Sequence, residues 1–190
     1  MSTLRNTLEL GGRRDASSLA WRRAVGVAAF AAATAVGARL AIPLPGTPVP
    51  FTLQPLFVLL AGAVLGARLG AASQALYLAA GVAGLPVFAM GGGLAYLLGP
   101  TGGYLLAYPA AAFLAGALGR SGGVRALPGL LLALASIYAG GLAWLAAVGS
   151  VDAAVALGLR PFVLADLVKV LMVLLLMTRI RGRALRTFGS

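Results

Sequence analysis

The chain of 190 residues is 61% hydrophobic and 10% charged, with a mean hydropathy of +0.98. This composition excludes an ordinary soluble domain and predicts an all-α integral membrane protein. The chain has no Cys, no His and only four Asp or Glu residues, which excludes disulfides, thiol catalysis and imidazole metal sites and argues against a hydrolytic carboxylate pair. The net charge of +11 comes from arginines at the ends of apolar runs, a pattern typical of membrane orientation and not of nucleic-acid binding.

Residues 1–20 are polar and lack a sustained period, which predicts a flexible cytoplasmic tail. The apolar run 24–42, which follows Trp21, is longer than the core of a signal peptide and is expected to be the first transmembrane helix. Small residues recur at every fourth position of this helix, which favours close packing within the bundle or onto another subunit. The two rows are Ala24, Ala28 and Ala32, and Ala29 and Ala33.

The next segments alternate between helices and unusual connections. Four prolines in residues 43–50 exclude a helix and predict a stiff, extended connector that can act as a lid. Helices are expected over residues 52–67 and 70–85. Residues 86–104 are too glycine-rich for a regular span and too apolar for a solvated linker, so we expect a re-entrant or capping loop. That segment lacks the lysine of a phosphate-binding loop, so nucleotide binding by this chain is not expected.

The C-terminal half supplies the remaining helices. We expect helices over residues 104–118 and 128–148, a loop over 149–160, and a sixth helix whose first turn contains Pro161. With six spans and the N-terminus inside, the arginines satisfy the positive-inside rule. The inner arginines are Arg5, Arg13, Arg14, Arg22, Arg23, Arg68, Arg120, Arg125, Arg179, Arg181, Arg183 and Arg186, and the outer ones are Arg39 and Arg160.

These assignments divide the chain into three parts. We expect a six-helix membrane domain over residues 21–180, between the N-terminal tail and a basic tail over residues 181–190. The protein is expected in a bacterial inner or plasma membrane, with both termini on its cytoplasmic side. Oriented this way, the proline-rich connector and the glycine-rich segment lie on the outer side, where a pocket for a solute captured from outside is expected.

The last apolar run contains an acid and a base, Asp166 and Lys169. A charge at the centre of a bilayer costs at least about 2.5 to 3.5 kcal/mol, so such residues usually face a protein interior, a cavity or a partner. Their i, i+3 spacing places them on one helix face, where they can pair and still present an acceptor and a donor to a ligand. The alternative is that the pair only neutralises itself between packed helices.

Four segments together resemble the BioY family, the biotin-specific substrate-binding (S) components of energy-coupling factor (ECF) transporters. They match the family in order and at compatible spacing. The segments are residues 47–55 (TPVPFTLQP), 84–89 (GLPVFA), 98–105 (LGPTGGYL) and 166–169 (DLVK).

The resemblance implies a six-helix S-component bundle with an outward biotin pocket closed by the first loop. It also implies coupling to a transmembrane T subunit and two ATPases, which alone bind ATP, with the alanine rows of the first helix docking on the T subunit. Asp166 and Lys169 are then expected to bind the ureido ring, whose donors and acceptor they complement. The expected apolar walls are Phe51, Tyr77, Phe88, Tyr104 and Trp144, and the expected carboxylate contacts are Gln54, Thr101 and the backbone N–H groups of Gly102 and Gly103.

The chain departs from the family pattern in one respect. No charged residue lies between Arg68 and Arg120, where a basic residue is expected, so the counter-charge of the biotin carboxylate is unassigned. Arg39 or backbone amides are candidates. Two other functions stay open: an S component for another vitamin, such as thiamine or riboflavin, and a structural membrane subunit in which the pair serves only helix packing.

Overall fold

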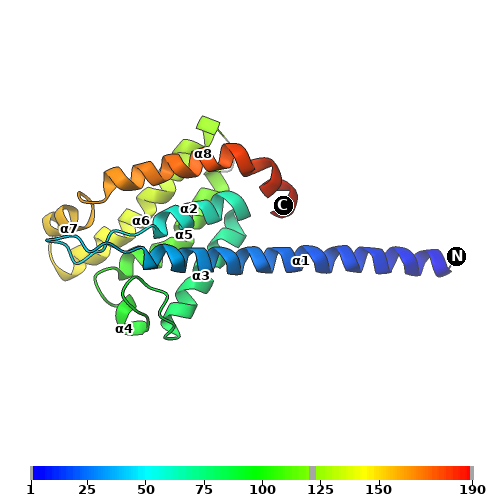
Figure 1. Ribbon diagram of the computed structural model, residues 1–190, viewed down its shortest axis with the longest axis horizontal. Helices are drawn as coiled ribbons and strands as arrows, with labels where there is room; N and C mark the ends of the chain where they lie inside the picture. Colours follow the sequence, from blue (N-terminus) through cyan, green and yellow to red (C-terminus); the bar gives the residue numbers. More distant parts are fainter. Residues whose placement is uncertain (1, 120–122, 189–190) are drawn as a thin grey trace.

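The computed structural model describes residues 2–119 and 123–188, and this part of the chain is almost entirely helical. Six helices of 12 residues or more run alternately up and down one bundle (Figure 1). They are α1 (Ser2–Arg39), α2 (Gln54–Leu65), α3 (Ala67–Val82), α5 (Gly102–Leu118), α6 (Leu127–Val148) and α8 (Val163–Phe188). Three short helices join them: α4 (Leu94–Leu97), η2 (Gly123–Ala126) and α7 (Val151–Gly158).

The observed helices differ from the expected ones in three main places. Helix α1 begins at Ser2 rather than near Trp21, and its N-terminal part projects beyond the bundle (Figure 1). Residues 149–160, expected as a loop, contain α7, because Ser150 caps it by accepting a hydrogen bond from the Ala153 N–H at 3.2 Å. Helix α8 continues through most of the expected basic tail. Arg120, expected among the inner arginines, lies outside the described residues.

Not every helix of the bundle is long enough to cross a bilayer alone. Among the described residues, Ser18–Arg39 and Gly123–Val148 are long and apolar enough. Val151–Gly158 and Val163–Ile180, which meet at 55°, form a third span if taken as one bent unit. Helices α2 and α5 are apolar but shorter. At 1.5 Å per residue, the 12 residues of α2 cover about 18 Å of a hydrocarbon core about 30 Å thick.

The C-terminal ends of α2 and α5 and the N-terminal end of α3 meet at glycines that have no room for a side chain. A Cβ at Gly62 would lie 2.1 Å from the Ala112 carbonyl oxygen, and one at Gly116 would lie 2.3 Å from the Ala67 nitrogen. Gly66, with a φ of +88°, lets α2 turn directly into α3. Backbones therefore approach closely here, as small residues allow in membrane proteins.

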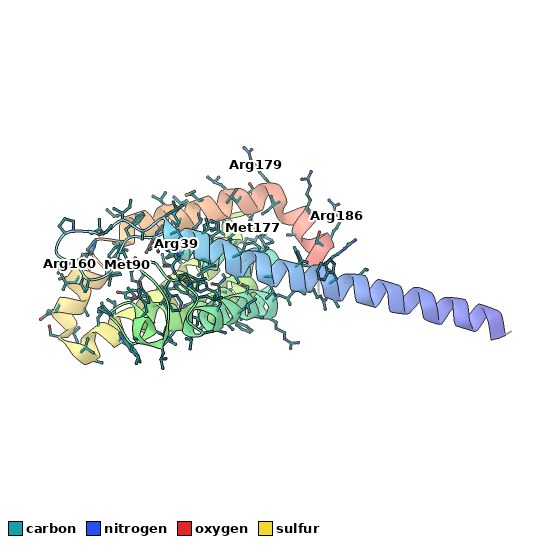
Figure 2. The ribbon with its side chains drawn as sticks, turned by 60° about the horizontal axis from the view of Figure 1, so that its bottom comes forward. Arg39, Met90, Arg160, Met177, Arg179 and Arg186 are labelled. Carbon is teal, nitrogen blue, oxygen red and sulfur yellow. The ribbon has the colours of Figure 1, made fainter. Side chains whose placement is uncertain are left out.

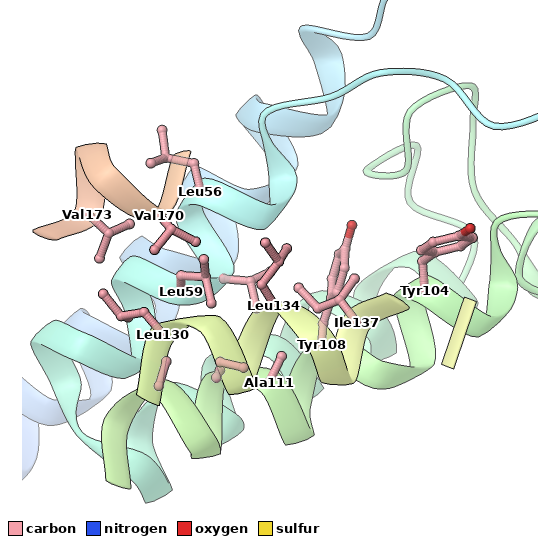
Figure 3. Packing of buried hydrophobic residues seen from close by; sticks show 14 of the residues in the cluster. Leu56, Leu59, Tyr104, Tyr108, Ala111, Leu130, Leu134, Ile137, Val170 and Val173 are labelled. Carbon is pink, nitrogen blue, oxygen red and sulfur yellow. The ribbon is translucent and has the colours of Figure 1, made fainter. Parts of the chain in front are cut away.

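The centre of the bundle is apolar and is built from α2, α5, α6 and α8. Leu59, Leu130 and Val173 are fully buried and point toward one another from three of these helices (Figure 3). One polar contact crosses the bundle nearby, where the Thr34 hydroxyl of α1 donates to the Gln74 side-chain oxygen of α3 at 3.2 Å. Both side chains are fully buried, so this bond fixes α1 against α3 without exposing polar groups to lipid.

The two ends of the bundle carry different features. Arg39, Met90 and Arg160 lie at the end formed by the non-helical connections, whereas Arg179 and Arg186 lie toward the end with the C-terminus (Figure 2). The segments before α2 and α5 thus gather at the first end, as expected for residues 43–50 and 86–104. The candidate site lies at this end.

Candidate functional site

A cavity opens between the α1–α2 connection, α4, α7, the N-terminal ends of α5 and α8 and the C-terminal half of α6. It contains about 560 Å³ of space not filled by protein atoms, including the part open to solvent. Its lining is Val49, Pro50, Phe51, Thr52, Gln54, Pro55, Ala89, Tyr96, Thr101, Tyr104, Leu105, Tyr108, Ile137, Tyr138, Gly158, Phe162, Asp166 and Lys169.

The expected acid and base form a buried ion pair at one wall of the cavity. Asp166 and Lys169 are 6% and 3% exposed, and Lys169 Nζ lies 2.5 Å from Asp166 Oδ1. Lys169 Nζ also donates to the Thr52 carbonyl oxygen at 2.6 Å and lies 4.1 Å from the centre of the Phe51 ring. These contacts compensate the desolvation that makes an isolated buried charge costly.

Tyr138 of α6 completes the environment of the carboxylate. Its hydroxyl donates to Asp166 Oδ2 at 2.5 Å, and its ring packs edge-on against Tyr104, with the ring centres 6.4 Å apart. Each carboxylate oxygen therefore accepts one hydrogen bond from the protein. The bond ties α6 to α8 at the level of the ion pair.

The ion pair keeps hydrogen-bonding capacity that the protein does not use. A protonated lysine has three N–H donors, and Lys169 directs two of them to Asp166 and Thr52. An ionised carboxylate has about four acceptor sites, of which Asp166 gives one to Lys169 and one to Tyr138. One donor and about two acceptor sites are left side by side at the cavity wall.

Gln54 faces the cavity, and Tyr77 lies behind it, away from the cavity. Gln54 lines the cavity, and its side-chain nitrogen donates to the Tyr77 hydroxyl at 2.7 Å. Tyr77 is only 1% exposed, donates to the Val87 carbonyl at 3.1 Å and does not line the cavity. Phe88, also fully buried, packs against Tyr77 and Tyr96 rather than lining the space.

The residues expected at the start of α5 divide into two groups. Thr101 and Tyr104 line the cavity, and the Tyr104 hydroxyl donates to the Gly158 carbonyl of α7 at 2.9 Å. Gly102 and Gly103 do not line it. The Gly102 N–H donates to the Gly99 carbonyl. A Cβ at Gly103 would lie 2.3 Å from the Gly140 carbonyl oxygen. These two glycines thus permit close packing of α5, including against α6.

Trp144 has a structural environment as well. Its indole N–H donates to the Gly99 carbonyl at 3.0 Å, and its side chain packs beside Gly102 and Gly103 instead of lining the cavity. Of the eleven expected ligand-contact residues, the structure brings six around the cavity. They are Phe51, Gln54, Thr101, Tyr104, Asp166 and Lys169.

Several aromatic side chains of the lining were not predicted. Tyr108 lies four residues after Tyr104, so the helical period alone places both on one face of α5, and Figure 3 shows their hydroxyls on the same side. That spacing is a signal that sequence reasoning could have used. No comparable signal marks Tyr138, whose position depends on how α6 crosses α8.

The proline-rich connection covers the cavity and is held at both its base and its tip. Ile42 and Phe51 exchange backbone hydrogen bonds of 2.8 and 2.9 Å, which close its base. Near its tip, the Thr47 hydroxyl donates to the Leu157 carbonyl of α7 at 2.7 Å. At the end of α1, the Arg39 guanidinium donates to the Pro86 carbonyl at 2.5 Å. The connection is non-helical, as expected, but it is not extended throughout, because it turns back at Pro45 and Gly46 so that its two ends pair.

The alanine rows of α1 lie on the outside of the bundle. Four of the five alanines are exposed and the fifth is half-buried. The exposed ones are Ala24, Ala28, Ala29 and Ala32, and the half-buried one is Ala33. Packing within this chain therefore leaves these rows largely uncovered.

Comparison with known proteins gives a consistent result. The BioY family model matches residues 12–186. The chain is 46% identical over 157 residues to a protein of Pyrococcus horikoshii described as a probable biotin transporter BioY, covering 82% of this chain and 94% of that protein. It is 40% identical over 164 residues to the biotin transporter BioY of Thermotoga maritima, covering 84% of this chain and 96% of that protein.

The fold is similar to that of a solved relative. A crystal structure of the S-component for biotin from an ECF-type ABC transporter superposes with a TM-score of 0.77 at 26% identity, over 90% of this chain and 93% of that chain. The resemblance and the S-component fold expected from the sequence are thereby confirmed, and the chain is a membrane protein. The BioY family model matches nearly the whole length of this chain, so the chain belongs to the BioY family.

Proposed function

We propose that this chain binds biotin at the outer face of the membrane and mediates its uptake. The observation that carries the proposal is the unused hydrogen-bonding capacity of Asp166 and Lys169, one donor beside about two acceptor sites. The ureido ring of biotin carries two N–H donors and one carbonyl acceptor, the complement of that set. The chain is a transport component and not an enzyme.

The rest of the cavity suits the remainder of the ligand. Aromatic and aliphatic walls from Phe51, Tyr104, Ile137 and Phe162 offer apolar surface to the fused rings and the hydrocarbon chain. The proline-rich connection above them, held by Thr47 and by the Ile42–Phe51 pair, supplies a cover. Release of biotin then requires this cover to detach from α7.

The proposal includes the partners that energise uptake. A T subunit would dock on the exposed alanine rows of α1, where small side chains allow two helix backbones to approach. An ATPase pair would bind the ATP. Arg179 and Arg186 at the end away from the cavity (Figure 2) support a cytoplasmic location for that end in the plasma membrane.

Direct binding tests the function. Purified protein in detergent is expected to bind labelled biotin saturably, and unlabelled biotin is expected to displace it, because the site complements the ureido ring. Thiamine and riboflavin, which lack that ring, are expected to leave the label bound. Displacement by either of them but not by biotin would assign the site to another vitamin. Failure of all three to bind would favour a structural subunit.

Replacing Tyr138 by phenylalanine is expected to weaken biotin binding by about tenfold or more, because a hydrogen bond to a charged group contributes about 1.5 to 3 kcal/mol. The change frees Asp166 Oδ2 and lets the carboxylate turn away from its binding geometry. The measurement is the dissociation constant from equilibrium binding. Tyr104→Phe is the control, since Tyr104 lines the same cavity but its hydroxyl donates to the Gly158 backbone carbonyl and not to Asp166. A larger loss for Tyr104→Phe than for Tyr138→Phe would contradict this role of Tyr138.

A further inference from the structure

The cavity presents a single pair of opposite charges and no surplus charge to a ligand. Among the described residues that line it, only Asp166 and Lys169 are charged, and they lie 2.5 Å apart as an ion pair. The remaining N–H donor of Lys169 lies at the wall proposed to receive the ureido ring. This lining therefore has no cation left to pair with the carboxylate of the ligand.

The two other cations at this end of the bundle are exposed, and one of them is hydrogen-bonded to the protein. Arg39 is exposed, does not line the cavity and donates to the Pro86 carbonyl. Arg160 is also exposed and outside the lining, and both lie at the outer end of the bundle (Figure 2). Charges in water are screened over about 10 Å at ordinary salt, so neither replaces a buried counter-ion.

The cavity instead offers neutral hydroxyls. Tyr96, Thr101 and Tyr108 line it, and within the described part of the chain their hydroxyl groups have no hydrogen-bond partner. A hydroxyl donates one hydrogen bond and accepts others. Such groups can serve a carboxylate, an amide or an ester carbonyl.

From this distribution we propose that the site does not recognise the charge of the carboxylate and accepts carboxyl-blocked biotin derivatives, such as the primary amide and the methyl ester, as well as biotin. The inference rests on the proposed function and defines its substrate class. A carboxylate entering this cavity loses its water shell without gaining a cation, so its negative charge brings no advantage over a neutral carbonyl.

Competition against labelled biotin tests the inference on the purified full-length protein. Unlabelled biotin, biotin primary amide and biotin methyl ester are each titrated, at about 50 mM and about 500 mM NaCl. The dissociation constants of the amide and the ester are expected within about fivefold of that of biotin, with ratios that salt does not change. A site with a buried counter-ion would instead penalise the neutral derivatives by about 30-fold or more.

Variants identify a hidden counter-charge if there is one. In Arg39→Gln and Arg160→Gln, the ratio of the amide constant to the biotin constant is expected to equal that of the parent protein. The inference is overturned if the parent penalises the amide 30-fold or more, or if either variant lowers the ratio by selectively weakening biotin. If biotin itself fails to bind, the proposed function fails and the substrate class with it. Tight biotin binding with rejection of both derivatives overturns the substrate class alone.

Discussion

Replacing Lys169 by methionine is expected to weaken biotin binding about 100-fold, because truncating one partner of a buried, hydrogen-bonded charge pair at a binding site costs about 2 to 5 kcal/mol of binding free energy. Methionine keeps much of the length of the side chain but loses the donors to Asp166 and Thr52. Asp166→Asn is expected to have an effect of the same order, since it leaves the ammonium group without its counter-charge. Equilibrium binding of labelled biotin to purified protein measures both.

Two further variants separate recognition from folding. Asp152→Asn is the matched control, because Asp152 is an exposed residue in the first turn of α7, outside the cavity, and binding is expected to equal that of the parent. The double variant Asp166→Asn with Lys169→Met removes both charges together, so its thermal stability is expected to recover toward the parent value while binding stays lost. If binding recovered in the double variant, or if both single variants bound like the parent, the pair would serve packing only.

Replacing Gly62 by alanine is expected to destabilise the protein by about 3 kcal/mol or more, at the upper end of overpacking effects. The added Cβ would lie 2.1 Å from the Ala112 carbonyl oxygen and 2.8 Å from the Gly116 nitrogen. Both neighbours are backbone atoms of α5, so no side chain can rotate to make room. The separation of α2 from α5 would have to increase, and the apolar contacts between them would loosen.

Thermal unfolding in detergent, followed by circular dichroism, measures this effect. Gly182→Ala is the control, because a Cβ at Gly182 meets no atom within 4 Å and alanine is a better helix former by about 1 kcal/mol. The control is expected to melt at or slightly above the parent temperature. Equal melting temperatures for Gly62→Ala and Gly182→Ala would show that the junction of α2, α3 and α5 tolerates a wider separation.

The fold was predictable to the extent that hydrophobic runs determine it. Uninterrupted apolar stretches and Pro or Gly breaks located all six long helices, and the prolines correctly excluded a helix over residues 43–50, although this connection turns back on itself instead of staying extended. Helix α7 was missed because its apolar residues were interpreted as part of a loop, although Ser150 provides a recognisable N-cap. The length of α1 was missed because residues before Trp21 show no apolar periodicity.

The candidate site was predictable only where one helix carries the signal. Asp166 and Lys169 are one turn apart, so their pairing follows from the helical period. Trp144, Gly102 and Gly103 were expected near a ligand because of their residue types, whereas their positions depend on the contact between α5 and α6. Tyr138 was not expected there, because its bond to Asp166 joins residues 28 positions apart on different helices.

The neutrality of the Asp166–Lys169 pair has a consequence for transport across an energised membrane. Moving one elementary charge through a potential of 100 mV changes its energy by about 2.3 kcal/mol. Opposite charges 2.5 Å apart cancel, so if the site is displaced through that potential during transport, the pair itself transfers no net charge. The same displacement with an anionic ligand transfers one negative charge. In such a displacement the voltage acts on the anionic ligand and not on the pair, and a carboxyl-blocked ligand removes that contribution.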